Sequence, residues 1–120
     1  SVRSSVNQEK QELLGQLKTL ADFNNAVYTQ MGEYPAWEYK KDSTLRDTMV
    51  EIYQKMYNTE PQVLAIHAGL ECGLLGEKLP GLDSVSLGPN MYDIHTSREK
   101  LDIASAQRTW EFLLAVLKKL

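Results

Sequence analysis

The stretch Gly88-Pro-Asn-Met-Tyr-Asp-Ile-His-Thr-Ser-Arg-Glu-Lys-Leu-Asp-Ile103 decides how the rest of the chain is interpreted. It follows an apolar run that is typical of a strand, and it precedes a strongly periodic helical pattern. In α/β proteins, chemistry is often located at such junctions, where the strands end. His95 lies within this stretch, flanked by hydroxyl and carboxylate side chains. It is therefore a candidate ligand, a candidate catalyst or an ordinary loop residue.

The apolar periodicity predicts helices on both sides of this stretch. Helices are expected over about residues 7–23, 43–57, 70–78 and 103–117, and strands over 26–32, 62–66 and 82–87. From residue 43 onward helices and strands alternate, which favours an α/β fold in which helices cover a sheet. Because the two strands predicted after residue 43 do not make a stable sheet by themselves, further strands are expected from elsewhere or from a second copy of the chain.

Size and composition exclude several classes of protein. The 120 residues suffice for one compact core. The net charge of −3, with scattered Lys and Arg, argues against a nucleic-acid partner. No apolar run approaches the roughly 20 residues that span a membrane. Cys72 is the single cysteine, so an internal disulfide is excluded and a reducing compartment, the cytoplasm, is favoured.

Two histidines are the natural candidates for metal chemistry. His67 and His95 each follow a predicted strand, and Glu71, Asp93 and Glu99 are the acids near them. A zinc site needs three or four such ligands, and no HxxxH or CxxC pair is present. Both histidines can equally be hydrogen-bonded loop residues.

Cys72 and the glycines beside it offer two further possibilities. Cys72 is a packed thiol or, with His67 or His95 as base, a nucleophile. Gly69 and Gly73 flank a turn whose backbone N–H groups can face an anion, or they allow close packing. The residues alone do not decide between these interpretations.

Several ordered motifs together resemble one enzyme family. They are Arg3-Ser-Ser5, Tyr34-Pro-Ala-Trp37, Val63-Leu-Ala-Ile-His-Ala-Gly-Leu-Glu-Cys-Gly73, Pro80-Gly-Leu-Asp-Ser-Val-Ser-Leu-Gly-Pro89 and His95-Thr-Ser-Arg-Glu99. This set, which extends over nearly the whole chain, is similar to the aminoacyl-histidine dipeptidases, also called Xaa-His dipeptidases or peptidase D. These are zinc metallopeptidases of the carnosinase type.

The resemblance implies a place for the chain in a longer protein. The family has a zinc catalytic domain with a smaller α+β lid and dimerisation domain inserted into it. Residues 1–33 would be the end of the lid domain, a helix followed by a strand. Residues 34–120 would be the C-terminal part of the catalytic domain, so the N-terminal half of that domain is missing from this chain. A cytoplasmic homo-oligomer is expected.

The resemblance also implies roles for individual residues. His95 would be the last zinc ligand of a two-zinc site. Arg3 would bind the terminal carboxylate of a dipeptide, and the backbone at Gly69 would contact the substrate. Glu99, His67 and Glu71 would lie next to these groups and orient them without binding the metal or the substrate themselves. The family often has a proline after the His-Ser pair, whereas this chain has Thr96-Ser97-Arg98, a mild departure.

The resemblance assigns no catalytic residue to this chain. The bridging aspartate, the other zinc ligands and the general-base glutamate of the family lie in the N-terminal half, so the 120 residues alone are expected to be inactive. The full enzyme would hydrolyse Xaa-His and other short dipeptides through a metal-bridged water. The alternatives are a related metal amidohydrolase, such as an N-acyl amino acid deacylase, and a non-enzymatic α/β binding or dimerisation module.

Overall fold

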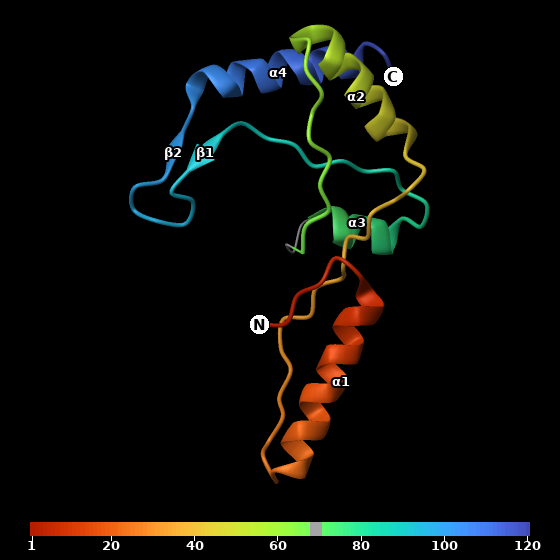
Figure 1. Ribbon diagram of the computed structural model, residues 1–120, viewed down its shortest axis with the longest axis vertical. Coiled ribbons are helices and arrows are strands. Elements are labelled where there is room, and N and C mark those ends of the chain that lie inside the picture. The colour runs from red at the N-terminus through yellow and green to blue at the C-terminus, as the bar shows by residue number, and fades with distance from the viewer. Residues whose placement is uncertain (68–70) are drawn as a thin grey trace. The chain divides into compact units, whose positions relative to one another are not determined.

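The computed structural model describes residues 1–67 and 71–120, and within these ranges the chain forms four helices and one small sheet (Figure 1). The helices are α1 (Asn7–Phe23), α2 (Thr44–Tyr57), α3 (Glu71–Lys78) and α4 (Ile103–Leu117), and the strands are β1 (Met91–Tyr92) and β2 (Lys100–Leu101). The chain divides into two compact units. The first unit comprises residues 1–42 and 63–84, and the second unit comprises residues 43–62 and 85–120.

The core of the second unit lies between α2 and α4. Met49, Phe112 and Val116 are buried there. The Phe112 ring meets the Tyr53 ring edge to face, with 5.5 Å between their centroids, an arrangement that adds to simple area burial. Partly buried apolar side chains surround this cluster: Leu45, Ile52, Tyr53, Tyr57 and Val85. The second unit is therefore held together mainly by one helix pair.

The ends of these two helices follow local rules of the sequence. Ser43 caps the start of α2, because its Oγ accepts a hydrogen bond of 3.1 Å from the Arg46 amide. Asn58 ends α2 in the left-handed conformation, which asparagine tolerates better than most residues. Asp102 begins α4 in the same way as Ser43, since its carboxylate accepts from the Ser105 amide at 3.0 Å. The predicted helices over 43–57 and 103–117 are thus confirmed with their boundaries.

The first unit is built on α1 and the chain that follows it. After Asn24 the chain turns and runs back alongside the helix (Figure 1). Lys10 Nζ donates to the Tyr34 carbonyl, and the Asn7 amide donates to Glu38 at 2.8 Å. Helix α1 has the bounds that the sequence predicts, and Val6 precedes it without a side-chain cap. No residue of α1 is buried, so polar contacts at one end hold the helix to the returning chain.

The three strands predicted over 26–32, 62–66 and 82–87 are wrong for this chain. Within the described residues, the two-stranded β1–β2 sheet is the only hydrogen-bonded ladder. Val27 is 93% exposed and Leu64 is 72% exposed, which a buried strand would not allow. Apolar, β-branched sequence favours an extended chain, but a strand exists only where a second strand pairs with it. The sequence predicts no strand at residues 91–92 and 100–101, yet these residues do pair as β1 and β2.

The division into a lid tail over 1–33 and a catalytic part over 34–120 remains a prediction. The first unit continues through residue 33 as far as residue 42. Both predicted domains are defined by the family resemblance, and contacts within these 120 residues do not test them.

Helix α4 carries apolar side chains on two opposite faces. Phe112 and Val116 face α2. Ile103, Trp110 and Leu117 recur at seven-residue steps on the other side, and they are 82%, 58% and 59% exposed. Polar residues such as Arg108 and Glu111 lie between these two apolar faces, so α4 has more apolar surface than a helix with a single buried stripe. Helix α4 therefore has one face satisfied within the second unit and one face available for another surface.

Replacing Phe112 by alanine is expected to lower the free energy of unfolding of the second unit by about 3 kcal/mol. The side chain is only 7% exposed and fills the space between α2 and α4. Trp110→Ala on the same helix removes a larger side chain, yet it is expected to cost less than about 0.5 kcal/mol, as for surface substitutions. Urea titrations followed by far-UV circular dichroism measure both values. Equal losses would contradict this assignment of the core.

Candidate functional site

The His95 side chain lies at the end of a short β-hairpin in the second unit. In this hairpin Met91 pairs with Leu101 and Tyr92 pairs with Lys100, antiparallel. The seven residues 93–99 that connect the strands are called the His95 loop below. Asp93 and His95 both adopt positive φ angles, of 51° and 65°. Non-glycine residues seldom occupy this region, and such positions concentrate at functional sites.

Thr96 organises the first half of the His95 loop. Its amide and its Oγ1 both donate to the Asp93 carbonyl, at 3.2 and 2.7 Å. Its Oγ1 also accepts from the Arg98 amide at 3.1 Å, and its carbonyl accepts from the Glu99 amide at 3.2 Å. The loop thus contains its own hydrogen-bond network rather than being an open connection.

Glu99 fixes the main chain of His95 directly. One carboxylate oxygen of Glu99 accepts a hydrogen bond of 2.8 Å from the His95 amide. Both side chains are exposed, which leaves the imidazole accessible from outside the hairpin. Of all the residues predicted to form the site, His95 and Glu99 are the pair that the described contacts bring together.

The hairpin is attached to the start of α4 through one buried hydroxyl. Ser105 Oγ accepts from the Asn90 amide at 2.8 Å and donates to the Asp102 carbonyl at 2.7 Å. The Asp102 amide in turn donates to the Asn90 carbonyl at 3.0 Å. Because α4 packs on α2 through Phe112, the His95 loop is supported by the core of the second unit.

The remaining predicted site residues belong to the first unit. Arg3 is exposed near the start of the chain, His67 is exposed in an extended segment, and Glu71 is the first residue of α3. No hydrogen bond or ion pair links any of these three to another predicted site residue in residues 1–67 and 71–120. Gly69, the predicted substrate contact, lies outside the described residues.

The donor set of this chain does not make a metal site by itself. Among the described residues, no group of three or more His, Cys, Asp or Glu side chains converges closely enough to hold a metal ion. A zinc ion takes at least three protein ligands. The exposed His95 imidazole on a supported loop is suited to supply one of them, so any zinc site that uses it needs ligands from outside these residues.

Cys72 is a free, half-buried thiol in α3. Within the part of the chain that the structure describes, no histidine nitrogen is hydrogen-bonded to it. The contacts therefore favour the packed thiol over the nucleophile that the sequence also allowed.

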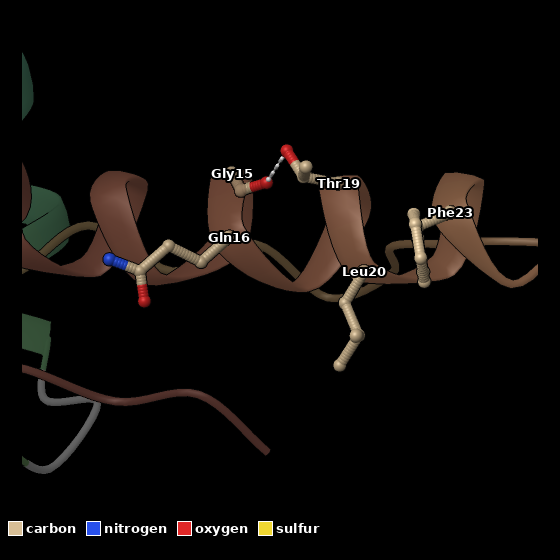
Figure 2. A pocket seen from close by; sticks show the side chains of 5 residues that line it. All are labelled: Gly15, Gln16, Thr19, Leu20 and Phe23. Atoms are coloured by element: carbon tan, nitrogen blue, oxygen red, sulfur yellow. Dashed lines mark hydrogen bonds between the residues drawn. The ribbon is translucent and has the colours of Figure 1, made fainter.

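A surface hollow lies along α1, but it has only one wall. It measures about 550 Å³ and is lined by Gly15, Gln16, Thr19, Leu20 and Phe23, all from the same helix. Figure 2 shows these side chains spread along α1, with the Thr19 hydroxyl donating to the Gly15 carbonyl at 3.0 Å. A hollow of this kind lacks the converging polar groups of a catalytic pocket.

The carboxyl group of Glu51, on α2 and not in the hairpin, has a pKa below its ordinary value. Lys55 lowers the pKa of the Glu51 carboxyl, first through a side-chain hydrogen bond and then through its charge. The two residues are one helical turn apart and both are exposed, so this pair is a surface feature of α2.

The residues that support the His95 loop are not among those that the sequence predicts for the site. Asn90, Thr96, Asp102 and Ser105 form that support. A signal was present for Asp102, because an aspartate directly before a helical stripe is typical of a capped helix start. The pairing of β1 with β2 has no comparable signal in the sequence.

Comparison with known proteins identifies what the chain is similar to. No family model matches it. Over 119 residues it is 33% identical to the cytosol non-specific dipeptidase of Escherichia coli strain K12, a match that covers 99% of this chain and 24% of that protein. The crystal structure of aminoacylhistidine dipeptidase from Vibrio alginolyticus superposes with a TM-score of 0.81 at 32% identity, covering 98% of this chain and 24% of the other.

These comparisons confirm two predictions from the sequence. The resemblance to the aminoacyl-histidine dipeptidases holds over nearly the whole chain. The α/β class holds as well, because the mixed helix and strand structure matches part of such a dipeptidase. The chain spans about a quarter of the length of both relatives.

Two glycines of α3 test how tightly the helix that follows His67 is packed. A Cβ at Gly73 would lie 2.9 Å from the Pro35 carbonyl oxygen, so Gly73→Ala is expected to destabilise the first unit. A Cβ at Gly76 would meet nothing within 4 Å, so Gly76→Ala is expected to stabilise α3 by up to about 1 kcal/mol. Thermal unfolding of the two variants measures the difference. If Gly73→Ala stabilised the chain as much as Gly76→Ala, the close packing against Pro35 would be refuted.

Proposed function

We propose that this chain is the C-terminal quarter of a cytoplasmic, zinc-dependent dipeptidase that hydrolyses Xaa-His and other short dipeptides. The observation that carries the proposal is the similarity to two dipeptidases over 98–99% of the chain, at 32–33% identity. One of these relatives is named an aminoacylhistidine dipeptidase and the other a cytosol non-specific dipeptidase. Described residues contain no helix that is long and apolar enough to cross a membrane.

In this proposal His95 is one zinc ligand and the other ligands lie in the remainder of the protein. The exposed imidazole on a supported hairpin suits that role. Zinc in a dipeptidase site supplies polarisation of the scissile carbonyl and lowers the pKa of a bound water. The general base also belongs to the remainder of the protein, so this chain contributes to ligand placement and substrate binding.

Arg3 is proposed to bind the substrate's terminal carboxylate. Its guanidinium is exposed, and guanidinium groups recognise carboxylates through two parallel hydrogen bonds. Binding at that end would select peptides by length. Backbone groups at Gly69 would contact the same substrate, and His67 and Glu71 would support the residues around them.

Two alternatives remain to be separated by experiment. A related deacylase would use the same metal chemistry on an N-acyl amino acid, and a binding module would have no hydrolytic activity. Side-by-side assays of the longer protein on carnosine and on an N-acetyl amino acid distinguish all three. Hydrolysis of carnosine alone supports the dipeptidase.

The isolated 120 residues are expected to bind zinc weakly or not at all and to hydrolyse no dipeptide, because they offer no cluster of three ligands in the described ranges. In the longer protein, His95→Ala is expected to lower kcat/KM on carnosine at least about 100-fold. Metal content after dialysis and the rate of histidine release measure the two effects. Stoichiometric zinc and carnosine hydrolysis by the isolated chain would refute the division of the site.

The isolated chain is also expected to self-associate. Large apolar side chains are exposed on α1 and on the outer face of α4, among them Leu20, Phe23, Ile103 and Trp110. In the longer protein the proposed partners are the rest of the enzyme and a second subunit, which would cover such surfaces. Light scattering of the chain and of Trp110→Glu measures the association. A monodisperse monomer at high concentration would contradict this expectation.

A further inference from the structure

The conformation of His95 requires something to stabilise it. Its φ of 65° lies in the left-handed region, where a side chain is strained and which residues other than glycine seldom adopt. Such a conformation persists only when surrounding contacts determine it. The question is which contact of the His95 loop does so.

The network around Thr96 constrains His95 only through the turn that it closes, because the Thr96 amide donates to the Asp93 carbonyl and His95 is the third residue of that turn. Its hydrogen bonds join Asp93, Thr96, Arg98 and Glu99. Within the described residues, the main chain of His95 has one hydrogen bond, which its amide donates to Glu99 at 2.8 Å. Glu99 is therefore the side chain that holds the His95 amide directly, in addition to the turn around it.

The hairpin explains why Glu99 reaches that amide. Glu99 is the last residue before β2, and its own amide is fixed by the Thr96 carbonyl at 3.2 Å. The Lys100–Tyr92 pair sets the register just beyond it. Its side chain thus starts from a fixed position four residues after His95 and returns across the loop. A carboxylate that accepts from an amide forms a stronger hydrogen bond than a neutral acceptor does.

We propose that Glu99 is a positioning residue, which fixes the backbone of His95 so that the imidazole is presented in one orientation before any metal binds. This inference rests on the proposed function for the identity of what the imidazole binds. An acid four residues after a metal ligand could itself bind the metal or exchange protons. The hydrogen bond to the amide assigns it instead to the conformation of the loop.

The first experiment measures the loop in the 120-residue chain, without metal. Amide hydrogen exchange at His95, followed by ¹⁵N NMR, is expected to accelerate about 5- to 10-fold in Glu99→Ala, which loses the acceptor. Glu99→Gln keeps an acceptor oxygen, and its rate is expected to stay within about threefold of the unchanged chain. Arg98→Ala is the matched control, because the hydrogen bond of Arg98 in this loop comes from its backbone amide. Equal rates in Glu99→Ala and Arg98→Ala would overturn the proposal.

The second experiment measures zinc affinity in the longer protein by competition with a chelator. Glu99→Ala is expected to weaken zinc binding about 10- to 100-fold, the effect typical of residues that orient a ligand, and Glu99→Gln to restore most of it. Unchanged affinity in Glu99→Ala, or no rescue by Glu99→Gln, would overturn the positioning role. If the unaltered longer protein bound no zinc, the proposed function would fail with the metal role. The exchange rates would still decide whether Glu99 fixes the loop.

Discussion

The hydrogen bonds of one buried hydroxyl connect the β1–β2 hairpin of the second unit to the start of α4. Ser105 Oγ is bonded to the amide of Asn90 before β1 and to the carbonyl of Asp102 before α4. Buried polar groups of this kind must be satisfied, and here both donor and acceptor capacity are used. The hairpin consequently cannot shift relative to α4 without leaving the Asn90 amide without its partner. This constraint links the core at Phe112 to the loop that carries His95.

The helices could be predicted from the sequence because their signals are local. Ser43 and Asn58 bound α2, and the apolar stripe from Ile103 to Leu117 marks α4. The strands could not, because pairing depends on partners far away in the sequence or absent from it. Leu64 and Val27 lie in runs that favour extended structure, yet these runs pair with nothing in the described residues. Met91 and Tyr92 form a strand only because Lys100 and Leu101 return beside them.

The candidate site was predictable to a different degree. Ordered motifs such as Tyr34-Pro-Ala-Trp37 carried the resemblance, and the two dipeptidase relatives confirm it. The geometry at His95 came only from the structure, since a positive φ and its hydrogen bond to Glu99 leave no mark in composition or periodicity. The roles of Arg3 and Gly69 remain proposals, because their ligands and neighbours are not among the described contacts. The likeness to part of a dipeptidase can thus be identified from the sequence more readily than the candidate site can be assembled.

The two faces of α4 separate the residues that form the core of this unit from residues that lie outside that core. Phe112 and Val116 are committed to α2, whereas Ile103, Trp110 and Leu117 contribute little to the unit's own core. The two sets are therefore free to change independently. Polar residues on the outer face would leave the core at Phe112 and the β1–β2 hairpin unchanged, because neither depends on that face. Substitutions on the inner face of α4 therefore change the stability of the unit, whereas substitutions on the outer face change its exposed surface.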